Sequence, residues 1–331
     1  MSALATLVIC AAALGQADAA DRVRTESEVE IVTGVVYATA QDRAGADVEL
    51  LMDVAYPRNT GETLAPAVLY FHPGAWERGS RADGREIIEI LARGGYVAAS
   101  VDYRLLAAAP FPAAVEDGNA AIRFVRGNAE ELGVDPERIG AIGHSAGGHL
   151  AALLGTSGNL GPFSRGVEAP NVPPSVQCVV SISGPMALDQ PDFNDEAQAI
   201  IDAWLEAPDA REHRRLARQA SPVAYVDADD PPVLLIHGGA DPLVPLSQPQ
   251  RLIRVMSGAG ATAELHMIED AGHGITTAEA HRLAAVFLDR HLGGAATAVI
   301  DTIAPPPADD DADYDLGDSI DETEDDGDDE R

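Results

Sequence analysis

Eight short apolar runs alternate with helix-like patterns along residues 29–292 of this 331-residue chain. Short apolar runs separated by helices are typical of strands buried on both faces of a parallel sheet. The first two runs have no helical pattern between them and predict a hairpin. The sequence therefore predicts an α/β domain with a central, mostly parallel eight-stranded sheet flanked by helices. The expected strands are residues 29–38, 48–55, 67–71, 97–101, 139–142, 178–182, 233–236 and 263–268, and the expected helices are residues 84–93, 112–132, 146–154, 246–259 and 277–291.

Two segments interrupt this alternation, and both follow the carboxyl end of an expected strand. Residues 157–175 are rich in glycine and proline and predict a loop. Residues 186–221 carry helical patterns near 197–205 and 210–219 with no strand between them. Because ligands bind at the carboxyl ends of strands in open α/β sheets, we expect both segments to form small, lid-like walls over a site.

The two ends of the chain differ in composition from the domain expected over residues 21–292. Residues 1–20 combine an apolar stretch with the pattern Ala-Asp-Ala at 17–19, which predicts a cleaved signal peptide and export to the periplasm or the cell exterior. Cys10 follows a short apolar stretch, so a lipoprotein is the alternative. Residues 293–331 have few apolar side chains and many acids, which predicts a disordered tail.

The net charge of −32 excludes one class of partner. Phosphate groups would be repelled by so acidic a chain, so no nucleic acid partner is expected. Beyond the first twenty residues, no run is long and apolar enough for stable insertion into a membrane. The oligomeric state is left open.

The tail holds one pattern that is similar to a calcium-binding loop. Asp311, Asp313 and Asp315 alternate, and Glu322 falls at the twelfth position of the loop that they would begin. The sixth position is Leu316, where the turn of such a loop needs glycine. The pattern is therefore incomplete, and the site that carries the chemistry is expected to need no metal.

The pentapeptide Gly-His-Ser-Ala-Gly at residues 143–147 has the form of a nucleophile elbow. A β-rich run precedes it and a helical run of small residues follows it. A sharp turn from strand to helix exposes the serine hydroxyl, and the glycines leave room for the close approach of the strand and the helix. Ser145 is therefore the predicted nucleophile.

A serine hydroxyl needs a base within hydrogen-bonding reach and a carboxylate that orients the base. Asp241 follows the run 233–236 in a turn rich in glycine and proline, and His273 follows the run 263–268. Serine, acid and histidine in this order, each after its own strand, are the arrangement of α/β-hydrolases. Four other histidines fit less well because they lie at a strand end, within a strand or on the final helix, namely His237, His266, His281 and His291.

The loop after the third expected strand carries the clearest family likeness. His-Pro-Gly-Ala-Trp at residues 72–76 resembles the His-Gly-Gly-Gly-Trp oxyanion motif of lipases and esterases. Together with residues 102–105, 143–149 and 237–245, it makes residues 45–292 resemble the feruloyl-esterase-like, BD-FAE-type branch of the α/β-hydrolases and its kynurenine formamidase relatives.

This resemblance implies a serine hydrolase that cleaves carboxylic esters through an acyl-enzyme and needs no cofactor. The oxyanion would bind the backbone amides of Gly74, Ala75 and Ala146. Two positions depart from the family pattern: Pro73 has no N–H to donate, and the methyl group of Ala75 must point away from the acyl group.

Several neighbouring residues are candidates for pocket or structural roles. His72, Trp76 and His144 flank the predicted site and are candidates for its walls. Asp102 and Arg104 are expected to form a buried ion pair beneath it. Asp117 and His149 are expected to be structural, since their spacing supports no metal site.

Two other functions remain open. An arylformamidase or another amidase would use the same residues, and a hydrolase fold without catalysis would act as a binding protein through its acidic tail. The complete set of serine, acid and histidine favours the enzyme. The expected substrate is a small-molecule or carbohydrate-linked ester, and its acyl and alcohol groups depend on pocket loops that the sequence does not define.

Overall fold

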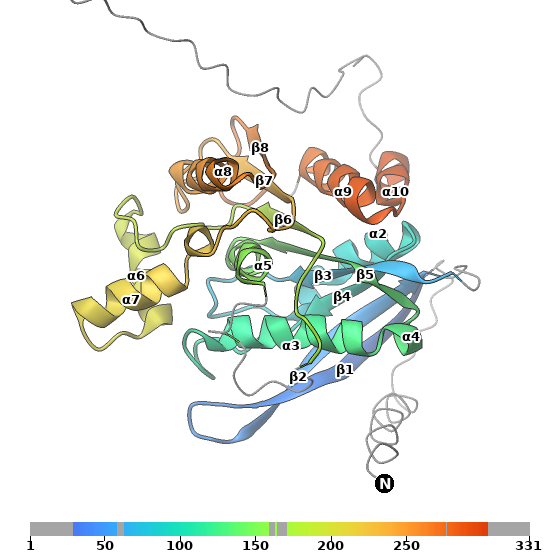
Figure 1. Cartoon of the computed structure of the whole chain (residues 1–331), viewed down its shortest axis with the longest axis horizontal. Helices are drawn as coiled ribbons and strands as arrows, with labels where there is room; N and C mark the ends of the chain where they lie inside the picture. The colour runs from blue at the N-terminus through green and yellow to red at the C-terminus, as the bar shows by residue number, and fades with distance from the viewer. Residues whose placement is uncertain (1–28, 58–62, 159–162, 164–170, 276, 304–331) are drawn as a thin grey trace, which may run out of the picture.

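A computed structural model describes residues 29–57, 63–158, 163, 171–275 and 277–303 (Figure 1). The predicted signal peptide, the Cys10 alternative and the calcium-like pattern of Asp311, Asp313, Asp315 and Glu322 lie outside these residues. In the described part of the chain, no helix is both long enough and apolar enough to cross a membrane.

The strands form one eight-stranded sheet in the order β1-β2-β4-β3-β5-β6-β7-β8. Strand β1 pairs antiparallel with β2, and β2 pairs antiparallel with β4, whereas all later pairings are parallel. The predicted α/β class, with a mostly parallel sheet and a leading hairpin, is confirmed. The strands are β1 (Val29–Gln41), β2 (Asp47–Pro57), β3 (Ala65–Phe71), β4 (Val97–Val101), β5 (Val134–His144), β6 (Cys178–Ile182), β7 (Val233–Gly238) and β8 (Ala263–Ile268).

Helices cover both faces of this sheet. In Figure 1, α2, α9 and α10 gather on one side, and α3 lies on the other. The α-helices are α2 (Arg85–Arg93), α3 (Ala113–Gly127), α4 (Ala129–Leu132), α5 (Ala146–Ser157), α6 (Asp195–Leu205), α7 (Ala210–Gln219), α8 (Ser247–Ala259), α9 (Ala278–Leu292) and α10 (Ala296–Ile303), and two 3-10 turns are η2 (Arg81–Gly84) and η4 (Pro222–Ala224).

The central strands are apolar along their whole length because each contributes side chains to two hydrophobic cores, one on each face of the sheet. In β3, Leu69 and Phe71 belong to the core beneath α3 and α5, whereas Val68 and Tyr70 belong to the core beneath α2 and α9. Side chains alternate between the two faces of a strand, so a strand covered on both faces has no polar positions. This explains why the sequence shows uninterrupted apolar runs.

Two features differ from the expectation for the helices. The pattern predicted as one helix over 112–132 is divided into α3 and α4 at Asn128, whose backbone leaves the helical region. The predicted tail from residue 293 includes the ordered helix α10. The Asp289 carboxylate accepts hydrogen bonds from the Ala296 and Thr297 amides, both at 2.9 Å, and so caps this helix from α9.

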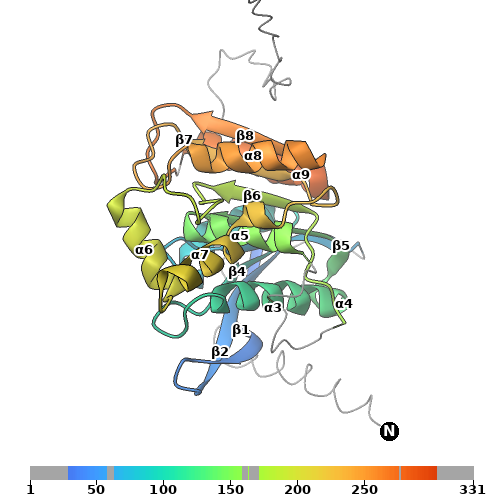
Figure 2. The ribbon, with the colours of Figure 1, turned by 60° about the vertical axis from the view of Figure 1, so that its left-hand side comes forward.

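The connection between β6 and β7 contains α6 and α7, as the sequence predicted, and is fixed to the start of α8. The Gln248 side-chain oxygen accepts hydrogen bonds from the amides of Met186 and Ala187 at 3.0 and 2.7 Å. Asp192 accepts a hydrogen bond from the Gln248 amide group at 2.8 Å. Figure 2 shows α6 and α7 side by side at one end of the sheet. These hydrogen bonds fix the start of the connection, residues 186–192, to α8.

Candidate active site

Ser145 lies at the turn between β5 and α5 with a backbone φ of 54°. A positive φ is strained for a residue with a side chain and is tolerated when the surroundings enforce it. Here the Ser145 amide donates to the Ile182 carbonyl at 2.7 Å. A Cβ on Gly147 would lie 2.0 Å from the Phe71 carbonyl oxygen. Only glycine therefore allows α5 to approach the end of β3 this closely.

Ser145, His273 and Asp241 form one hydrogen-bonded chain. The Ser145 Oγ lies 2.7 Å from His273 Nε2, and His273 Nδ1 lies 2.8 Å from Asp241 Oδ2. With Nδ1 protonated and donating to the carboxylate, Nε2 is free to accept the serine proton. The side chain of Asp241 is fully buried, whereas 19% of the His273 side chain is exposed. The predicted nucleophile, base and acid thus meet at the carboxyl ends of their strands.

The Asp241 carboxylate is stabilised in its charged form. Burial alone would raise its pKa, but hydrogen bonds from His273 and from the Val244 and Leu243 amides lower the pKa below its usual value. Those two amides donate to Oδ1 at 3.0 and 2.9 Å. An ionised carboxylate at neutral pH can hold the orientation of the His273 ring.

His237 supports the acid, a role that its position at a strand end did not reveal. Its Nε2–H donates to the Val244 carbonyl at 2.9 Å and lies 3.6 Å from Asp241 Oδ2. Burial lowers the pKa of His237, which keeps the ring neutral. The sequence signal was its spacing, four residues before Asp241 at the end of the preceding strand.

His144 lies beside Ser145 in the elbow and contacts the base. Its Nε2–H donates to the backbone carbonyl of His273 at 2.9 Å, and the two ring centroids are 5.7 Å apart. Burial lowers the pKa of His144, which favours the neutral ring, and the neutral ring donates this bond with its proton on Nε2. The side chain predicted as a wall of the pocket therefore holds the backbone of the base.

The loop with the predicted oxyanion donors has an unusual backbone. Gly74, Ala75 and Trp76 have successive positive φ values of 127°, 58° and 56°. The Gly74 carbonyl accepts the amides of Glu77 and Arg78, both at 3.0 Å. The amides of Gly74 and Ala75 donate to no other residue in the described ranges. They are free for a ligand. The Ala146 amide lies in the first turn of α5, where backbone amides have no partner within the helix, so it is expected to be free as well.

His72 and Trp76, the other predicted wall residues, lie in the core with 1% and 3% of their surface exposed. The His72 ring stacks on Tyr103 at a centroid distance of 4.2 Å, and Tyr103 donates its hydroxyl proton to the His72 carbonyl at 2.9 Å. Trp76 stacks on Trp204 of α6 at 4.1 Å. The two buried rings therefore anchor both ends of the loop of residues 72–76 in the core.

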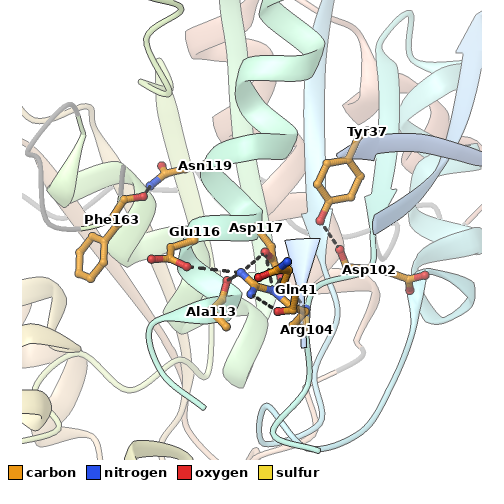
Figure 3. Close-up of polar contacts among 9 residues, drawn as sticks. All are labelled: Tyr37, Gln41, Asp102, Arg104, Ala113, Glu116, Asp117, Asn119 and Phe163. Carbon is orange, nitrogen blue, oxygen red and sulfur yellow. Dashed lines mark hydrogen bonds and ion pairs between the residues drawn. The ribbon is translucent and has the colours of Figure 1, made fainter. Parts of the chain in front are cut away.

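The predicted ion pair between Asp102 and Arg104 is wrong. Asp102 pairs with Arg81 of η2, whose Nη1 lies 2.6 Å from Oδ2. Arg104 instead pairs with the buried Asp117, with its Nη2 2.7 Å from Oδ1. Figure 3 shows the Arg104 guanidinium among Asp117, Glu116 and the carbonyls of Gln41 and Ala113. Asp117 is structural, as predicted.

A depression of about 410 Å³ lies next to the oxyanion loop. Glu77, which directly follows Trp76, forms part of its lining, and the Trp76 carbonyl accepts the amide of Leu106 at 2.8 Å. The full lining is Arg43, Glu77, Leu106, Ala107, Ala203 and Glu206. Among the described residues, no group of three or more His, Cys, Asp or Glu side chains could hold a metal ion.

Comparison with known proteins identifies esterases among the relatives of this chain. Residues 52–256 match the model of the BD-FAE family. Esterase LipC of Mycobacterium tuberculosis is 32% identical over 237 residues, which are 70% of this chain and 58% of LipC. Carboxylesterase NlhH of the same species is 33% identical over 190 residues, which are 54% of this chain and 57% of NlhH. The chain spans about half the length of the curated relatives it matches.

Solved structures agree with the fold. A truncated form of a carbohydrate esterase from gut microbiota has a TM-score of 0.71 and 27% identity, and the match covers 81% of this chain and 99% of that one. The propionate-bound esterase Est2 of Thermogutta terrifontis has a TM-score of 0.65 and 28% identity, with 77% and 92% covered. The α/β-hydrolase fold is therefore confirmed.

Proposed function

The chain belongs to the BD-FAE family, and from this premise we propose that it hydrolyses carboxylic esters by serine catalysis. The observation that carries the proposal is the chain of hydrogen bonds from Ser145 through His273 to Asp241. Nucleophile, base and orienting carboxylate have the distances that acyl transfer requires. The esterase relatives support the same reaction class.

In the first half of the reaction, the Ser145 oxygen attacks the ester carbonyl carbon while His273 Nε2 accepts the serine proton. The ionised Asp241 accepts the Nδ1–H bond and stabilises the imidazolium that forms. The carbonyl π electrons move onto oxygen. As that oxyanion forms, it accepts hydrogen bonds from the amides of Gly74, Ala75 and Ala146; removal of one such donor from a serine protease costs about 2.7–4 kcal/mol.

In the second half, the tetrahedral intermediate collapses and the bond to the leaving oxygen breaks. His273 gives its proton to this oxygen, the alcohol departs, and the acyl group remains on Ser145. Water then attacks the acyl-enzyme with His273 as base and Ser145 as leaving group, which releases the carboxylic acid. These steps require no cofactor.

Small-molecule and carbohydrate-linked esters are the proposed substrates. LipC and NlhH are named as esterases, and one structural neighbour is a carbohydrate esterase. The depression beside Glu77 is lined by none of the triad residues, so we assign to it only the part of such a substrate that lies remote from the scissile bond. Its carboxylates, on Glu77 and Glu206, are suited to accept hydrogen bonds from hydroxyl groups.

Hydrolysis of p-nitrophenyl acetate by the chain and by Ser145→Ala tests the proposal. The variant should fold normally and lose turnover to the level of the buffer blank. A panel of acetyl, feruloyl and formyl donors, each as ester and as amide, then separates esterase from formamidase activity. Unchanged turnover in Ser145→Ala would overturn the assignment, and faster cleavage of amides than of esters would replace it with an amidase.

A further inference from the structure

Four arginines form a stripe along the exposed face of α7. They occupy positions 211, 214, 215 and 218 and are all exposed. Residues spaced by three, four and seven positions share one face of a helix. The opposite face packs on the protein through the buried Ala217 and the partly buried Leu216. We call this set of four residues the arginine stripe.

Most of the positive charge of the arginine stripe is not neutralised by its neighbours. Arg215 pairs with Glu212. Within the described part of the chain, Arg211, Arg214 and Arg218 form no ion pair within 4 Å, and the Glu212 carboxylate that pairs with Arg215 is also the one that attracts Arg211. The nearby Asp209 is used as the N-cap of α7, where it accepts hydrogen bonds from the amides of Arg211 and Glu212, both at 2.9 Å.

This concentration of charge is exceptional in the chain as a whole. All 22 basic residues are arginines, and four of them fall in the ten residues of α7, although the net charge is −32. An arginine binds carboxylates through two parallel hydrogen bonds, which makes a carboxylate-rich chain a suitable occupant. Because no large apolar side chain lies on the stripe, it lacks what a membrane-inserting helix needs.

We propose that the acidic segment 304–331 of the same chain docks on the arginine stripe. This segment carries fourteen Asp or Glu residues and one arginine, a net charge of −13. The remaining residues 1–303 carry −19, so an external polyanion is repelled by the body of the protein. The tethered segment overcomes this repulsion because a linker gives an effective concentration on the order of 1 mM.

The segment is long enough to reach α7. It leaves the domain at α10, which Figure 1 places away from α7 across the molecule. Its 28 residues span up to about 95 Å when extended. A domain of this size has a diameter of about 50 Å, estimated from a radius of gyration of about 18 Å. Half the circumference of such a domain is about 78 Å, so the segment can run around it and bring its last residues, among them Asp328, Asp329 and Glu330, to the stripe.

Energy transfer between two dyes on the full chain tests this docking. One dye is attached at Ala210→Cys at the start of α7 and the other at Ser319→Cys in the segment, in a Cys10→Ser background. Cys178 is fully buried and does not react. Transfer should be high at about 0.01 M salt and fall at about 1 M salt, where the screening length drops from about 30 Å to about 3 Å.

The variant R211Q/R214Q/R218Q should lower the docking equilibrium about tenfold at low salt, since three exposed ion pairs are lost. A matched control, R93Q/R254Q/R290Q, removes three arginines from other helices and should leave the transfer unchanged. Equal transfer in the stripe variant and the parent at low salt would overturn the proposal.

Two further outcomes would also contradict it. Transfer between donor-only and acceptor-only chains, growing with concentration, would assign the stripe to the segment of a second copy. Binding to vesicles of anionic lipid that depends on the stripe, with no transfer within the chain, would assign it to a membrane surface.

Discussion

Removal of the His144 side chain tests whether the elbow holds the base in place. In His144→Leu, the His273 carbonyl loses the Nε2–H donor at 2.9 Å but keeps the Ile275 amide at 3.2 Å. Loss of one partner of a buried hydrogen bond costs about 1–3 kcal/mol. Because a second donor remains, we expect the lower part of this range, about 1–2 kcal/mol.

If the displaced base carries the whole of this cost into the activation free energy, kcat decreases about 5- to 30-fold, since 1.36 kcal/mol is tenfold. The reason is that a base displaced by a fraction of an ångström from Ser145 transfers the proton less effectively. KM should change by less than about twofold because His144 binds the enzyme's own backbone and not the substrate. His144→Gln places an amide N–H near the position of Nε2 and should recover most of kcat.

Initial rates with p-nitrophenyl acetate give kcat and KM for the three proteins, and urea unfolding shows how much stability each variant loses. A wild-type kcat in His144→Leu would refute the reasoning. So would His144→Gln with a kcat as low as that of His144→Leu, because the donor would then not be the important feature. A change confined to KM would instead make His144 a substrate contact.

Asp241→Asn should lower kcat by about 10⁴-fold with little change in KM, because the amide favours the wrong His273 tautomer; a loss below tenfold in initial-rate assays would argue against its role. Gly147→Ala should abolish turnover, since its Cβ would lie 2.0 Å from the Phe71 carbonyl oxygen, and an active variant would show that the elbow can relax. Burial lowers the pKa of His149 from 6.5 to about 4, so the unfolded chain takes up its proton first and the free energy of unfolding decreases as pH falls from about 6.5 to 4, by at most about 3 kcal/mol. His149→Gln should lose correspondingly less stability over that range in urea titrations, and parallel curves would contradict this assignment. Deletion of residues 304–331 should leave turnover of p-nitrophenyl acetate unchanged, and a large loss would show that the acidic segment contributes to the site.

The sequence was sufficient to predict the sheet and the meeting of Ser145, Asp241 and His273. Burial on both faces makes each central strand an apolar run, and runs of this kind are visible without a structure. In a parallel sheet with crossover helices, residues that follow successive strands reach the same edge. Sequence order therefore implied spatial proximity for these three side chains.

Side-chain partners were harder to predict because they depend on contacts between distant segments. Asp102 and Arg104 are neighbours in sequence, yet each pairs with a residue from another element, Arg81 and Asp117. Likewise, α10 is capped by Asp289 of α9, which the acidic composition of the following residues concealed. Local propensity contains no information on such partners.

The stacking of Trp76 on Trp204 has a consequence for how this protein can be altered. Trp76 follows the amides proposed to bind the oxyanion, and Trp204 belongs to the segment between β6 and β7. Exchange of that segment for one from a relative, a common route to new specificity, would remove the aromatic support of the donor loop. A change in the segment between β6 and β7 that alters specificity would therefore alter the turnover rate as well. A grafted segment should retain an indole at the position of Trp204 if the recipient is to keep its turnover.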